Sequence, residues 1–165
     1  MKSYTRCILV IFFAVCNKLS AQVPKDSELF RRLKSHDSLF FERAFNQCDL
    51  HYLETAIDSG LIFYHDQGGV QNRDKFIENT KLYICGDSIR KPIRKVDVQS
   101  LEVYPMYNSG MLYAVVQTGV HNFYIKEKYK DEVLTSCAKF IHLYLLINDK
   151  WILKEVISFD HQPPE

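Results

Sequence analysis

The stretch KWILKEVISFDH, residues 150–161, decides how the rest of the chain is interpreted. It is typical of a long strand that ends on two ionisable groups, Asp160 and His161. A second apolar run, from Phe140 to Ile147, lies just before it across a turn at Asn148-Asp149. Two long runs joined by a short turn predict a hairpin in the middle of a sheet, onto which earlier elements pack.

The amino end has the pattern of a removable leader. Lys2 and Arg6 precede a short apolar run over residues 7–16, and Leu19-Ser20-Ala21 follows as a small-residue cleavage site. The run is too short to span a bilayer as a stable anchor. We therefore expect a signal peptide over residues 1–21, a single domain over residues 22–165, and an exported protein that is periplasmic or secreted.

The charge balance excludes one large class of partners. Residues 1–21 hold three of the 21 basic side chains and none of the 20 acidic ones, which leaves 18 against 20 and a net charge of −2. This is not the basic surface of a nucleic-acid-binding protein. We expect no nucleic-acid partner, no membrane contact after leader removal, and no cofactor.

Three cysteines remain beyond the leader: Cys48, Cys85 and Cys137. Their spacing fits neither a metal knuckle nor a redox pair. Export permits one disulfide. We nevertheless favour three mostly buried thiols over a bridge.

Periodicity predicts helices first and a sheet afterwards. Apolar residues recur at spacings of three, four and seven after the capping sequence Asp26-Ser27-Glu28, which predicts a long amphipathic helix. The complete prediction is two helices up to Gly60, a strand over 61–66, a helix from 72 to 84, a solvated basic loop over 88–94, and strands over 96–104, 111–126, 135–147 and 150–159. Helices followed by consecutive antiparallel strands define an α+β fold class.

Four local patches accompany this order: FYHDQGG at 63–69, QTGVHNF at 117–123, AKFIHLY at 138–144, and the last strand from Trp151 through SFDHQ at 158–162. With them the chain, over about residues 27–162, resembles the nuclear-transport-factor-2-like superfamily, in particular exported bacterial domains of unknown function in its SnoaL-like branch. The resemblance implies a cone in which three N-terminal helices pack on a strongly bent antiparallel sheet. It also implies an apolar cavity inside the cone and a homodimer formed through the sheet. It implies no single activity, because the superfamily holds ketosteroid isomerase, scytalone dehydratase, polyketide cyclases and non-catalytic proteins.

Strand alternation then selects a candidate pocket, because residues of equal parity share a face. Each of the last three predicted strands places one histidine among aromatic residues on one face, and the short strand adds another histidine at its end. The predicted pocket residues are Tyr64, His65, His121, Phe123, His142, Tyr144, Trp151, Phe159 and His161.

Two carboxylates lie next to these histidines. We expect Asp66 and Asp160 to stand behind the pocket. Neighbours on a strand point opposite ways, so Asp160 is expected to tie down the strand end while His161 faces the cavity.

Three functions remain open. The first is an exported domain that binds a small, partly apolar molecule without chemistry. The second is an isomerase, dehydratase or cyclase in which His121 or His161 acts as acid or base. The third is an interaction or dimerisation module. The histidines also admit a purely structural interpretation. A zinc site, which needs three or four converging ligands, is not predicted.

Overall fold

The computed structural model describes residues 21–164, so the predicted leader lies outside the described residues except for its last position. The elements are α1 (Glu28–Phe41), η1 (Glu42–Asn46), α2 (Leu50–Ala56), β1 (Ile57–His65), β2 (Gly69–Asn72), α3 (Arg73–Asn79), η2 (Thr80–Ile84), β3 (Arg90–Val96), η3 (Val98–Ser100), β4 (Glu102–Asn108), β5 (Met111–Glu127), β6 (Val133–Ile147) and β7 (Lys150–Gln162). The segments η1 and η2 are π-helical turns, and η3 is a single 3₁₀ turn. Within this part of the chain, no helix combines the length and the apolar character that crossing a membrane requires.

Side-chain caps fix where the three α-helices begin. Ser27 Oγ accepts a hydrogen bond from the Phe30 amide, and Asp49 and Asn72 cap α2 and α3 in the same way. Each cap satisfies an amide that has no partner within its own helix. The helix starts expected from the sequence are therefore confirmed.

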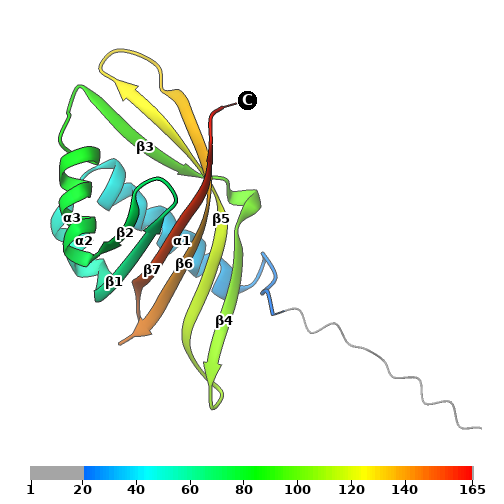
Figure 1. Cartoon of the computed structure of the whole chain (residues 1–165). Coiled ribbons are helices and arrows are strands. Elements are labelled where there is room, and N and C mark those ends of the chain that lie inside the picture. Colours follow the sequence, from blue (N-terminus) through cyan, green and yellow to red (C-terminus); the bar gives the residue numbers. More distant parts are fainter. Residues whose placement is uncertain (1–20, 165) are drawn as a thin grey trace, which may run out of the picture.

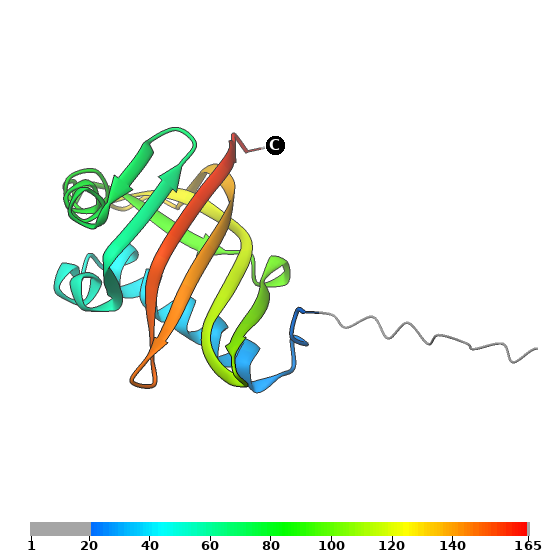
Figure 2. The same ribbon diagram turned by 60° about the horizontal axis from the view of Figure 1, so that its bottom comes forward.

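The seven strands of the described chain form one strongly curved, unclosed sheet in the order β2-β1-β7-β6-β5-β3, with β4 also paired to β5. Figures 1 and 2 show this sheet curving around α1, while α2 and α3 lie beside its β1–β2 end. The α+β class is confirmed. The expectation of a fully antiparallel sheet is wrong in one place, because β1 pairs with β7 in parallel.

Three segments differ from the predicted assignments. The expected single strand over 96–104 is wrong, because β3 ends at Val96, the 3₁₀ turn η3 follows, and β4 begins at Glu102. The expected basic loop contains strand β3, which pairs with the carboxyl half of β5 and buries Arg94. The second helix ends at Ala56, before Gly60, and β1 begins at Ile57. Local propensity gave no sign of these differences, because strands β1 and β3 form by pairing with strands that are distant in the sequence.

The core fills the concave side of the sheet. On α1 the buried residues are Phe30, Leu33, Asp37 and Phe40, at spacings of three and four that place them on one face. They pack against a layer from the sheet that includes Val115, Phe140, Tyr144, Trp151 and Leu153. Asp37 is fully buried within this apolar stripe and therefore needs a partner.

Candidate functional site

A cavity of about 630 Å³ lies between the concave face of the sheet and the helical segments. Its volume falls within the range of small-molecule sites. The walls are mainly aromatic, with rings from Phe40, Phe41, Phe45, Phe63, Phe76 and Phe123. Four histidines also line it: His65, His121, His142 and His161.

The deepest polar feature is a buried ion pair between Asp37 on α1 and Arg94 on β3. Arg94 Nη1 donates to Asp37 Oδ2 at 3.0 Å, and the side chains are 2% and 0% exposed. The guanidinium also lies 3.4 Å from the centre of the Phe41 ring, a cation–π contact. Burial acts to raise the pKa of Asp37, but Arg94 and a hydrogen bond from His142 hold it well below its usual range. Asp37 is therefore ionised, and the two charges cancel.

His142 lies between two aromatic rings and beside this pair. Its ring stacks on Phe140 at 4.3 Å and on Phe41 at 5.3 Å between centroids. Its Nδ1 lies 3.5 Å from Asp37 Oδ1, so Nδ1 carries the proton that faces the carboxylate. Burial lowers the pKa of His142, which keeps the ring neutral and leaves Nε2 with a free lone pair. Among the described residues, this Nε2 is a buried atom without a hydrogen-bond partner.

His121 extends the polar network from Arg94 towards the last strand. Arg94 Nε donates to His121 Nδ1 at 3.0 Å. Because an arginine can only donate, the proton of neutral His121 lies on Nε2, which donates to Ser158 Oγ at 3.2 Å. Burial, and after it the charge of Arg94, lower the pKa of His121 to about 2.

His161 and Asp66 form the other end of the network. His161 Nδ1 lies 2.6 Å from Asp66 Oδ1, and the His161 amide donates to Asp66 Oδ2 at 3.1 Å. Nδ1 therefore carries the proton, and Nε2 accepts from Ser158 Oγ at 3.4 Å. A continuous hydrogen-bonded chain thus runs from Asp37 through Arg94, His121, Ser158 and His161 to Asp66, and we call it the polar chain.

His65 covers His161 from one side. The two rings stack with centroids 4.5 Å apart, and His65 Nδ1 accepts hydrogen bonds from the Gln67 and Gly68 amides. Burial, and after it the charge of His161, lower the pKa of His65.

His65, Asp66 and His161 also bring three possible metal-ligand atoms within 4.8 Å of one another. The nitrogen that each histidine turns towards Asp66 already has a hydrogen-bond partner. An ion held by these two nitrogens would replace those hydrogen bonds. The geometry therefore favours a hydrogen-bonded histidine–aspartate pair over a metal centre.

Two bulges in β7 explain which of its side chains face inward. The β6–β7 register shifts between Leu143 and Tyr144, and again between Cys137 and Lys139. Each shift adds one residue to β7 and reverses the alternation. At the second bulge Asp160 has a φ of +59°, which turns His161 into the cavity beside Ser158.

The bulges correct part of the predicted pocket. Phe159 pairs with Lys139 and does not line the cavity. Asp160 does not stand behind a cavity histidine, because its carboxylate binds Lys139 Nζ at 2.8 Å outside the pocket. That contact ties the strand end to β6.

Three aromatic residues of the predicted pocket also lie elsewhere. Tyr64 is 41% exposed and shares the outer face of the sheet with its pairing partner Ile157. Tyr144 and Trp151 do face inward, but they belong to the packed core and do not line the cavity. The tyrosine hydroxyl lies 3.4 Å from His142 Nδ1, behind the wall.

Sequence reasoning missed Asp37, Arg94 and Ser158. One signal for Asp37 was available: it lies four residues after Leu33 and three before Phe40, on the apolar stripe of a predicted amphipathic helix. A charge at such a position needs a buried partner. Arg94 was assigned to a solvated loop, and nothing local distinguished Ser158.

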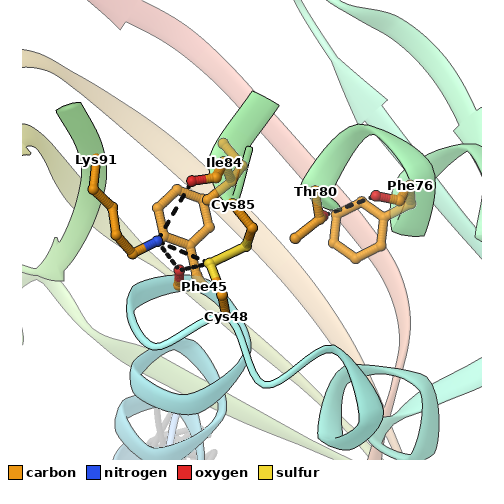
Figure 3. The surroundings of a disulfide bond; sticks show 7 residues. All are labelled: Phe45, Cys48, Phe76, Thr80, Ile84, Cys85 and Lys91. Atoms are coloured by element: carbon orange, nitrogen blue, oxygen red, sulfur yellow. Dashed lines mark hydrogen bonds between the residues drawn. A yellow bond between two sulfur atoms is a disulfide. The ribbon is translucent and has the colours of Figure 1, made fainter. Parts of the chain in front are cut away.

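A disulfide joins the two π-helical turns beside the cavity (Figure 3). Cys48 follows η1 and Cys85 follows η2, so the expectation of three free thiols is wrong, and Cys137 alone is free among the described cysteines. The bridge lies next to the lining residues Phe45 and Ile84. Lys91 Nζ contacts Cys48 Sγ and donates to the carbonyl oxygens of both lining residues. Together these contacts hold the two turns at a fixed separation.

Comparison with known proteins identifies the fold. A scan against protein-family models gives no match, and neither does a search of curated proteins. Among solved structures, Aln2 from a Streptomyces species superposes with a TM-score of 0.65 at 8% identity, over 79% of this chain and 89% of that one. A putative calcium/calmodulin-dependent protein kinase II association domain from Xanthomonas campestris gives 0.62 at 15% identity, over 82% and 89%. An NTF2-like protein from Cytophaga hutchinsonii gives 0.55 at 16% identity, over 78% and 95%.

Proposed function

Given the nuclear-transport-factor-2-like fold of this chain, we propose that it is an exported domain that binds a neutral aromatic molecule carrying a hydroxyl group. The observation that carries the proposal is the buried, unpartnered Nε2 of His142 in the cavity wall. A buried acceptor without a partner costs free energy, and a ligand hydroxyl would relieve that cost. Asn79 Oδ1, also on the wall and without a partner among the described residues, is a second acceptor of this kind.

The charges of the cavity favour an uncharged ligand. Two cationic side chains line the cavity: Arg94 is neutralised by Asp37, and Lys75 is paired with Glu78. A charged ligand would give up its hydration without meeting a free opposite charge, which is unfavourable in a site of low dielectric. The aromatic walls supply the contact area for a ring system.

The disulfide supports export. Disulfides persist in oxidising compartments and are rare in the cytosol. Export and self-association through the outer face of the sheet both remain predictions.

Titration calorimetry with three naphthalene probes tests the ligand class. The probe 2-naphthol is neutral and has a hydroxyl donor, 2-methoxynaphthalene lacks the donor, and 2-naphthoate is an anion of similar size. We expect 2-naphthol to bind about 10-fold or more tightly than the other two, because one hydrogen bond to a buried acceptor contributes about 1–2 kcal/mol. Tighter binding of 2-naphthoate would rule out the neutral-ligand proposal.

A matched pair of variants locates the contact. His142→Phe keeps an aromatic ring in the stack but removes Nε2, so it should lower the affinity for 2-naphthol to that for 2-methoxynaphthalene. His51→Gln changes an exposed histidine outside the cavity and should have no effect. Undiminished 2-naphthol binding by His142→Phe would exclude His142 as the acceptor.

A second candidate function is proton transfer on a bound carbonyl compound. His161 favours it, because Asp66 fixes its Nδ1 proton and so presents Nε2 as a base within the cavity. His121 is less suited, because Arg94 donates to its Nδ1 lone pair and burial lowers its pKa to about 2. Proton exchange at the α-carbon of 2-tetralone in D₂O, followed by NMR, tests this function: acceleration that is lost in His161→Ala supports it, and exchange at the buffer rate excludes it.

A further inference from the structure

Ser158, His161 and Asp66 form an arrangement that goes beyond ligand binding and proton transfer. Asp66 holds the Nδ1 proton of His161, and the opposite nitrogen, Nε2, faces Ser158 Oγ. An ionised carboxylate can only accept, so His161 Nδ1 donates to Asp66, and the unprotonated Nε2 accepts from the Ser158 hydroxyl. A serine hydroxyl that donates to an imidazole, which in turn donates to a carboxylate, is the arrangement of a nucleophilic serine.

We propose that Ser158 is an acyl-accepting nucleophile and that the cavity hydrolyses small, uncharged esters. Ser158 lies on the cavity wall with 4% of its surface exposed, and His161 lies beside it on the same wall. Both come from β7, which is held between β1 and β6, so their separation is fixed by the sheet and by the bulge at Asp160.

His121 completes the arrangement from the other side. Its Nε2–H donates to Ser158 Oγ, and Arg94 holds it in that tautomer. Because this donor occupies a lone pair of Oγ, it directs the serine proton towards His161 Nε2. Because burial lowers the pKa of His121 to about 2, the ring does not compete with His161 for the serine proton.

The reaction balances with water as the second substrate. Ser158 Oγ forms a bond to the ester carbonyl carbon while its proton passes to His161 Nε2. The tetrahedral adduct then expels the alkoxide, which leaves as an alcohol with the proton from His161. Water attacks the acyl-serine, gives one proton to His161, and releases the carboxylic acid; His161 returns that proton to Ser158. Ser158 and His161 are catalytic residues here, and Asp66 is a positioning residue.

Diisopropyl fluorophosphate tests the nucleophile, because it phosphorylates an activated serine and leaves a stable mass increase. We expect one equivalent of label on Ser158, none in Ser158→Ala, and a labelling rate at least about 100-fold lower in His161→Ala. Ser59→Ala changes an exposed serine outside the cavity and should label at the original rate. No label on the folded wild-type protein, or label retained in Ser158→Ala, would overturn the proposal.

Asp66→Asn distinguishes positioning from a purely structural role. It should lower the maximal labelling rate but leave unchanged the reagent concentration that gives half that rate. Turnover of 4-nitrophenyl butyrate, lost in Ser158→Ala, provides a second readout. Binding of 2-naphthol is measured separately on Ser158→Ala, so the nucleophile proposal and the ligand-class proposal fail independently.

Discussion

Removal of the disulfide should cost this fold much of its stability. The bridge joins Cys48 to Cys85, which are 37 residues apart in the sequence. Closing a loop of that length lowers the entropy of the unfolded chain by about 13 cal/mol/K, which corresponds to about 4 kcal/mol of folding free energy at room temperature. Lys91 keeps its carbonyl partners Phe45 and Ile84 when the bridge is absent, so the loss is assigned to the cross-link itself.

The assay is urea unfolding of the Cys48→Ser/Cys85→Ser double variant beside the oxidised protein. We expect the free energy of unfolding to fall by about 4 kcal/mol and the melting temperature by about 10–15 °C. Cys137→Ser is the matched control, because Cys137 is outside the bridge, and it should leave both values nearly unchanged. A loss below about 1 kcal/mol in the double variant would refute the cross-link reasoning.

Three further predictions concern the buried polar groups and the bulge. Arg94→Met should lower the free energy of unfolding by about 3–5 kcal/mol, because it leaves Asp37 buried without its ion-pair partner. The Asp37→Leu/Arg94→Met double variant should recover most of that loss. Equal instability of the single and double variants in urea unfolding would contradict this prediction. Because the pKa of His121 is lowered in the folded protein, this residue takes up a proton at a higher pH in the unfolded chain than in the folded one. The free energy of unfolding, measured by denaturant titration, should therefore fall by about 1 kcal/mol for each pH unit below 6.5. His121→Phe should flatten this slope, and His51→Gln should not. Asp160→Gly should be tolerated or raise the melting temperature, because Asp160 has a positive φ, whereas Asp160→Val should lower it; equal effects of the two changes would argue against the bulge.

Much of the fold could be predicted because its signals are local. Long apolar runs with a turn at Asn148-Asp149 indicated the β6–β7 hairpin, and both turn residues do have positive φ. The amphipathic period of α1 and the capping residues are also local features. Parallel pairing of β1 with β7, and the strand character of β3, depend on distant partners and left no such signal.

The site was only partly predictable, because strand alternation is reliable only until a bulge interrupts it. His121 and His142 lie on strands whose inward residues keep the expected parity up to the cavity. On β7 the first bulge reverses that parity, which moves Phe159 outward and brings Ser158 inward. The second bulge lies beyond these two residues and reverses the parity again. His161 keeps its predicted side because two reversals cancel. The pairing of Cys48 with Cys85 was hidden for a similar reason, since it depends on how close two separate turns come in space.

A crystal structure of the protein with 2-naphthol tests the assignment of the cavity most directly. The predicted result is a naphthalene ring among the phenylalanines of the wall, with its hydroxyl oxygen within about 3 Å of His142 Nε2. A naphthol bound outside the cavity, or bound inside it with the hydroxyl turned away from His142, would contradict the assignment.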